Sequence, residues 1–118
     1  MMTREPDIVE RTFKFAVRIL KMAGAIPRTT VGGVMTRQIV RSATSIGANV
    51  TEAQGSSTKK DFVRRINIAR GEARETLYWL RLIAESKLLP AGRLGDLTQE
   101  ADELVRILTA IVKRSRGV

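Results

Sequence analysis

The sequence contains no cysteine and no histidine, and these two absences exclude several kinds of chemistry. A chain without cysteine has no thiol nucleophile and no disulfide, and one without histidine lacks the usual zinc ligands and the common general base. An enzyme built on this chain would depend on carboxylates, lysine or backbone groups. We therefore expect a protein that is not an enzyme and that holds no metal and no cofactor.

Aromatic residues, proline and long apolar runs are also scarce. There are three prolines, one tryptophan, one tyrosine and three phenylalanines among 118 residues, while alanine, leucine, isoleucine, arginine and glutamate are abundant. This composition favours helix over sheet. No stretch resembles a signal peptide or approaches the ~18 apolar residues of a membrane span, so we expect one cytoplasmic domain over residues 1–118 with no membrane partner.

What the sequence does contain is positive charge. Lysine and arginine number 21 against 12 acidic residues, for a formal net charge of +9. Residues 58–93 carry nine bases and four acids, whereas residues 94–118 carry four of each. A strongly basic domain is typical of nucleic-acid binding, but an arginine-rich solvated surface would look the same. Both interpretations stay open at this point.

Apolar periodicity and punctuation by glycine, proline and capping residues predict four helices. We expect them over residues 7–23, over 34–53, from the residue after a Thr58 N-cap to about residue 87, and over 90–113. Gly47 should weaken or kink the second helix. Short connections between amphipathic helices predict an all-α fold, an antiparallel up-and-down four-helix bundle.

Two of the predicted helices have more apolar positions than a helix needs to pack against a single core. Those of the first helix cover an arc of roughly 200°, twice the ~100° of a simple surface helix. In the third helix the predicted core stripe includes Leu77 and Ala84, and three apolar residues lie off it: Ile68, Trp79 and Ile83. We expect the extra apolar surface to mediate self-assembly rather than membrane contact.

Three blocks in the middle of the chain carry a resemblance to a known family. The first contains Arg41, Ser45, Ile46, Asn49, Val50 and Glu52; the second, Lys60, Asp61 and Phe62; the third, Ala69, Gly71 and Glu75. In this register the chain resembles the bacterial four-helix-bundle proteins associated with intervening sequences of large-subunit ribosomal RNA genes. It departs from their pattern at Gly47, where proline is usual, and at Thr76, where leucine is usual.

The resemblance implies an up-and-down four-helix bundle that assembles into a ring, commonly a homopentamer. A relative within this fold is the accessory variability protein of diversity-generating retroelements. That relative binds nucleic acid and a reverse transcriptase through a basic surface, so RNA or DNA and a protein are the partners that the resemblance suggests.

Two lines of bases are the candidate nucleic-acid-binding residues. Helical spacing places four bases on one strip of the first helix and three in nearly one direction on the third. Tyr78, between two of these arginines, could stack on a base, but a packing or interface role is favoured. The lines consist of Arg11, Lys14, Arg18 and Lys21, and of Arg70, Arg74 and Arg81.

A polar cluster is expected where the second and third helices meet. It comprises Arg41, Asn49, Glu52 and Glu75. Two facing carboxylates, Glu52 and Glu75, could in principle hold Mg²⁺ or act as acid and base. We favour a structural network in which one of them pairs with Arg41 or caps the loop at Gly55.

These patterns together predict a non-catalytic basic oligomer that binds RNA or DNA through phosphate contacts without strong sequence specificity. The alternative is a protein-interaction module that docks an acidic partner, such as a nucleic-acid enzyme. A metal-dependent enzyme using the two glutamates is the weakest hypothesis.

Overall fold

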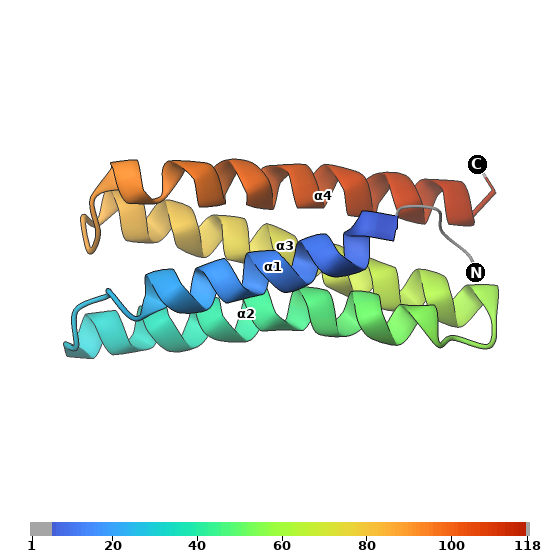
Figure 1. Cartoon of the computed structure of the whole chain (residues 1–118), viewed down its shortest axis with the longest axis horizontal. Coiled ribbons are helices and arrows are strands. Elements are labelled where there is room, and N and C mark those ends of the chain that lie inside the picture. The colour runs from blue at the N-terminus through green and yellow to red at the C-terminus, as the bar shows by residue number, and fades with distance from the viewer. Residues whose placement is uncertain (1–5, 118) are drawn as a thin grey trace.

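The computed structural model describes residues 6–117, with side chains described from residue 8, and this part of the chain is helical with no strand. Its helices are α1 (Pro6–Ala23), α2 (Thr30–Gln54), α3 (Lys59–Glu85), a 3-10 turn η1 (Ala91–Arg93) and α4 (Gly95–Ser115). All four long helices run along one axis of a body measuring 45 × 20 × 19 Å, with the connections at its two ends (Figure 1). The predicted all-α class and number of helices are confirmed.

Capping threonines begin the two central helices. The Thr58 hydroxyl accepts a hydrogen bond from the Asp61 amide at 3.0 Å, as the sequence predicts, and Thr29 accepts one from the Gly32 amide at 3.0 Å. The second cap starts α2 four residues earlier than predicted and places Gly32 within its first turn. A Cβ on Gly32 would lie 1.9 Å from the Pro27 carbonyl oxygen, so this loop can fold back on the helix only over glycine.

Helices α1 and α3 occupy diagonally opposite positions in the bundle. Helix α2 packs extensively on both of them, whereas α4 packs mainly on α3 and meets α1 less closely. Helix α2 continues through Gly47, where the sequence predicted a weak point. A Cβ there would be 3.4 Å from the Thr12 hydroxyl of α1, which is ordinary van der Waals contact, so this helix pairing does not require glycine.

The buried stripe of α3 differs from the predicted one at its C-terminal half. Thr76 and Ile83 are fully buried, whereas Leu77 and Ala84 are only half-buried. The prediction that Ile83 lies off the core was therefore wrong. A polar threonine can occupy the core because its hydroxyl is 2.8 Å from that of Ser42 on α2, and this contact satisfies both buried groups.

No described helix combines the length and apolar character that crossing a bilayer requires.

Candidate nucleic-acid interface

Arg11 holds α1 against α4 and is not a free member of the first basic line. Its Nε and Nη2 donate to the two carboxylate oxygens of Glu100, each at 2.9 Å, and Nη2 also donates to Glu103 at 2.6 Å. These hydrogen bonds raise the pKa of the Arg11 guanidinium, and the bond to Glu100 has the larger effect. The guanidinium therefore stays charged. A planar guanidinium matched to a carboxylate in this way gives both strength and orientation. The prediction that Arg11 belongs to an open phosphate-binding strip was therefore wrong, because both of its acidic partners occupy the guanidinium.

The other three bases of the first line are exposed to solvent on α1. Lys14 forms a long ion pair with Glu10, at 3.9 Å, which contributes little at such an exposed position. Arg18 and Lys21 have no ion pair with a described residue. The line that remains extends from residue 14 to residue 21, or about 10 Å along the helix.

The second line, on α3, has no ion pairs within the described chain. Arg74 and Arg81 are exposed, and Arg70 is half-buried. Tyr78 lies one helical turn from each of the two exposed arginines, and its side chain is 54% exposed. Its ring contacts Trp79 edge to face, with centroids 5.0 Å apart, and its outer face stays accessible. This arrangement leaves both the stacking and the interface interpretation of Tyr78 available.

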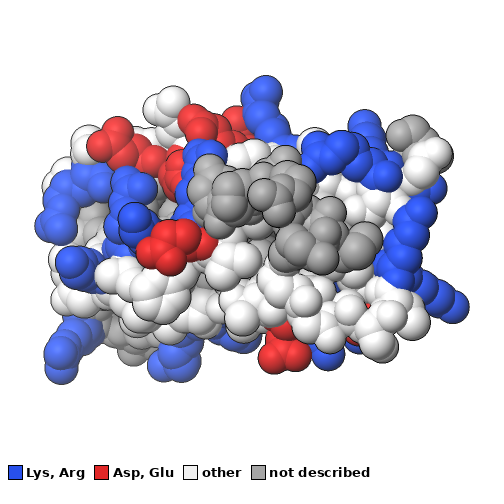
Figure 2. Space-filling view, turned by 45° about the vertical axis from the view of Figure 1, so that its right-hand side comes forward, with Lys and Arg blue, Asp and Glu red and all other residues white. Residues whose placement is uncertain are grey.

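Helix α4 separates the two lines. Glu100 and Glu103 of α4 face α1 through Arg11, and Asp102 lines a surface cavity together with Leu77 of α3. In Figure 2 carboxylates gather at the upper left of the face next to lysine and arginine atoms along its left margin, and further lysine and arginine atoms follow the right-hand margin with little red between them. The lines are therefore two separate surfaces on a single chain, divided by acidic side chains.

The polar cluster between α2 and α3 is present in part. Arg41 of α2 pairs with Glu75 of α3 and lies 3.4 Å from Glu72, and the Trp79 indole donates to Glu75 at 3.0 Å. Of the two glutamates that the sequence offered as partners of Arg41 or caps of the Gly55 loop, Glu75 is the one that pairs with Arg41. Trp79 is half-buried and packs against the edge of the core, with its ring nitrogen in this network.

Asn49 and Glu52 lie outside this network. Asn49 donates to the Ser45 carbonyl at 2.9 Å and to the Ser45 hydroxyl at 3.1 Å, within α2. The Glu52 side chain has no hydrogen bond with a described residue and borders an apolar groove of about 440 Å³ between α1 and α2. It is eleven positions beyond Arg41, about 16 Å along the helix, so the fold does not bring Glu52 to Glu75. The geometry required for the two-glutamate metal site is absent.

Several functional contacts were missed from the sequence. The acidic partners of Arg11 carry a weak signal, because Glu100 and Glu103 are spaced to share one face of a helix. The Ser42–Thr76 pair has a comparable signal, because each hydroxyl lies at the edge of an apolar stripe. Neither signal says which residue of another helix lies opposite.

Comparison with known proteins places the chain in a family. The family model described as 23S rRNA-intervening sequence protein matches residues 4–110. The chain belongs to the 23S rRNA-intervening sequence protein family. A similar solved structure is that of a protein of unknown function from the S23 ribosomal protein family of Bacteroides thetaiotaomicron. It is 34% identical over 90% of this chain and 98% of that one, with a TM-score of 0.84. No curated protein matches this member of the 23S rRNA-intervening sequence protein family.

Proposed function

We propose that this protein is a cytoplasmic, non-catalytic scaffold that binds RNA or DNA through phosphate contacts, without strong sequence specificity. Its frame is an antiparallel up-and-down four-helix bundle that assembles with copies of itself. The family's link to ribosomal RNA intervening sequences supports an association with nucleic acid.

The observation that carries the proposal is the number of cations left without a carboxylate. Arg18 and Lys21 on α1 and Arg74 and Arg81 on α3 are exposed, and none of them pairs with a described acid. Unpaired surface arginines repel one another, and phosphate groups would relieve that repulsion. Cations of this kind bind phosphates whatever the base sequence, so backbone recognition is the simplest mode.

Self-assembly is supported by apolar side chains on the outer surface. Phe13 and Leu20 of α1 are 62% and 47% exposed, and Leu82 of α3 is 37% exposed. Such residues are better covered by another copy than by water, and the family resemblance suggests a pentamer. Light scattering coupled to gel filtration tests this, and a monomer of 13.1 kDa would contradict it.

A filter-binding titration tests nucleic-acid binding directly. Structured RNA and duplex DNA should bind at low salt, with each neutralised duplex phosphate adding about 0.9 to the salt slope. The double variant Arg74→Gln with Arg81→Gln should weaken binding to different sequences equally. A matched loss of charge elsewhere, Arg28→Gln with Arg93→Gln, should have little effect. The absence of low-salt affinity in the wild-type protein would refute the proposal.

The exposed apolar groove between α1 and α2 favours a second candidate, the docking of an acidic protein such as a nucleic-acid enzyme. Nuclease treatment distinguishes protein docking from nucleic-acid binding, because it removes nucleic acid and leaves a bound protein in place. A partner protein retained after nuclease treatment, with no nucleic acid in the complex, would favour docking over phosphate binding.

A further inference from the structure

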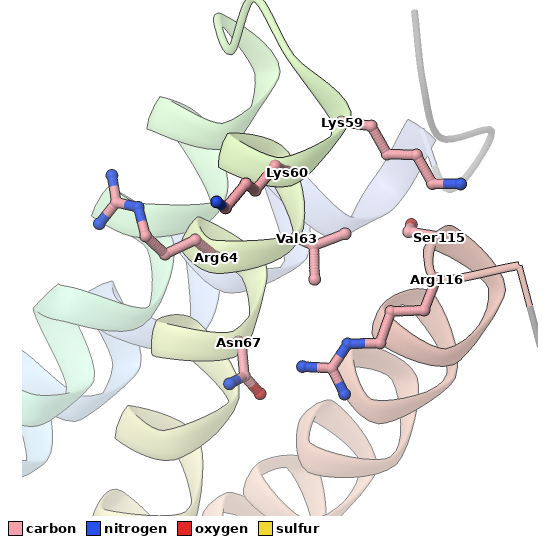
Figure 3. A pocket seen from close by; sticks show the side chains of 7 residues that line it. All are labelled: Lys59, Lys60, Val63, Arg64, Asn67, Ser115 and Arg116. Atoms are coloured by element: carbon pink, nitrogen blue, oxygen red, sulfur yellow. The ribbon is translucent and has the colours of Figure 1, made fainter.

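A basic groove lies at the end of the bundle where α3 begins and α4 finishes. It has a volume of about 690 Å³, and we call it the end groove. In Figure 3, Lys59 and Arg116 lie on the α4 side of Val63, and Lys60 and Arg64 lie on its other side. The residues that define it here are Lys59, Lys60, Val63, Arg64, Asn67 and Arg116.

The four cations of the end groove have little acidic compensation. Arg64 pairs with Asp61 at 2.8 Å, whereas Lys59, Lys60 and Arg116 have no ion pair with a described residue. None of these residues belongs to the two lines predicted from the sequence. Three of the cations lie in the first two turns of α3, and the adjacent C-terminus of α4 adds Arg116 to them.

Lys59 and Lys60 also occupy positions that helix electrostatics disfavour. They are the first two residues of α3, where the helix dipole is positive and acidic side chains are usual. A basic residue at a position that destabilises the helix is typical of a functional site, where function and stability favour different residues. An anion in the end groove would offset both the dipole and the mutual repulsion of the cations.

The floor of the end groove combines an apolar and a polar group. Val63 supplies the apolar part, and the Asn67 Oδ1 is buried without a hydrogen-bond partner. The Arg116 guanidinium points toward Asn67 in Figure 3. An unpartnered acceptor suits a ligand that brings a hydroxyl close to its phosphate, as a nucleotide does.

We propose that the end groove is a nucleotide-phosphate site, in which Lys59, Lys60 and Arg116 bind one or two backbone phosphates of a nucleic-acid strand. The attached sugar and base lie against Val63, within reach of Asn67. This inference rests on the proposed nucleic-acid function and locates a part of it that the lines on α1 and α3 do not include.

Fluorescence anisotropy with a labelled single-stranded RNA of about twelve nucleotides tests the site. The double variant Lys60→Gln with Arg116→Gln removes one cation from each side of the groove. Its affinity should fall about tenfold, and its salt slope should fall by about 1.4 for two lost phosphate contacts. The control, Arg28→Gln with Arg93→Gln, removes the same charge from exposed positions at the opposite end and should change affinity by less than about twofold.

The outcomes separate this inference from the proposed function. If the wild-type protein binds neither this strand nor structured RNA or duplex DNA at low salt, both are overturned, and if it binds only structured RNA or duplex DNA, the end groove is overturned alone. If it binds but the two double variants lose affinity equally, only net charge matters and the end groove is overturned alone.

A second readout locates the ligand. Amide chemical shifts on titration with the same RNA should move in residues 59–67 and 115–117 if the site is correct. Shifts confined to the α1 and α3 lines would overturn it, while inorganic phosphate reproducing every shift would show that the groove takes phosphate without the nucleotide.

Discussion

The seam between α1 and α4 and the end groove both contain arginine, in opposite electrostatic conditions. At the seam, Arg11 is paired with two carboxylates, and its side chain is 31% exposed. At the end groove, Arg116 has no ion pair with a described residue, and two lysines of the same groove increase the positive charge around it. The difference teaches that position along the sequence does not separate structural from binding cations. What separates them is whether the fold supplies an acid opposite.

The largest expected effect is at the seam. Replacing Arg11 with methionine leaves Glu100, whose side chain is only 17% exposed, without its counter-cation. We expect the free energy of unfolding to fall by about 2 to 3 kcal/mol, measured by urea denaturation. Adding Glu100→Gln and Glu103→Gln should recover part of the loss. A change within 0.5 kcal/mol, the roughly neutral range of surface substitutions, would place Arg11 with the unpaired cations.

The second paired arginine should matter less because it is more exposed. Arg41 has a side chain that is 53% exposed and faces Glu72 and Glu75 across the α2–α3 seam. Arg41→Met should lower the free energy of unfolding by about 0.5 kcal/mol, an amount typical of exposed ion pairs. The same denaturation series compares it with Arg11→Met. A loss equal to that of Arg11→Met would show that burial does not distinguish the two seams.

At the end groove, removing charge should stabilise the protein. Lys59→Gln with Lys60→Gln relieves the unfavourable charge at the start of α3, and we expect a gain of about 0.5 kcal/mol. Lys21→Gln is the matched control because Lys21 lies in the last turn of α1, where the dipole favours a base. It should lower stability by about 0.3 kcal/mol. If the double variant destabilises the protein as Lys21→Gln does, Lys59 and Lys60 have a structural role.

The smallest effect concerns the paired cation of the end groove. The Arg64 guanidinium lowers the pKa of Asp61, so the folded state favours the carboxylate. Its stabilising contribution is complete above the unfolded-state pKa and is lost as pH falls through the folded-state pKa. Asp61→Asn should therefore flatten the acid side of the stability profile and leave the rest of its shape unchanged. Unfolding midpoints measured across acidic pH for both proteins check this.

The sequence predicted what depends on local pattern. The Thr58 cap, the start of α1 and the end of α2 follow from side chains within one or two turns of each site. Helical propensity predicts a later start for α2 because Gly32 and Gly33 are poor helix formers. The close approach of the Pro27 carbonyl, which requires glycine there, is visible only in the folded chain.

The candidate site was predicted in composition but only partly in arrangement. A pair between Arg41 and one of two glutamates was among the alternatives, because a polar residue at the edge of an apolar stripe commonly meets one on the neighbouring helix, but only the structure shows that the partner is Glu75. The first basic line was assembled from helical spacing alone, and spacing cannot show that Glu100, 89 residues from Arg11, lies opposite it. Whether the free cations of these lines bind nucleic acid stays a prediction.

The sequence by itself determined the helical class, the family and the large positive charge, since these depend on composition, periodicity and short motifs. The tertiary structure decided how that charge is divided. Packing α4 between α1 and α3 neutralises Arg11 and separates the two basic lines, and bringing the ends of α3 and α4 together concentrates unpaired cations in one groove. Coulomb interactions depend on distance in space, so residues far apart in the chain determine which cations remain available to a phosphate.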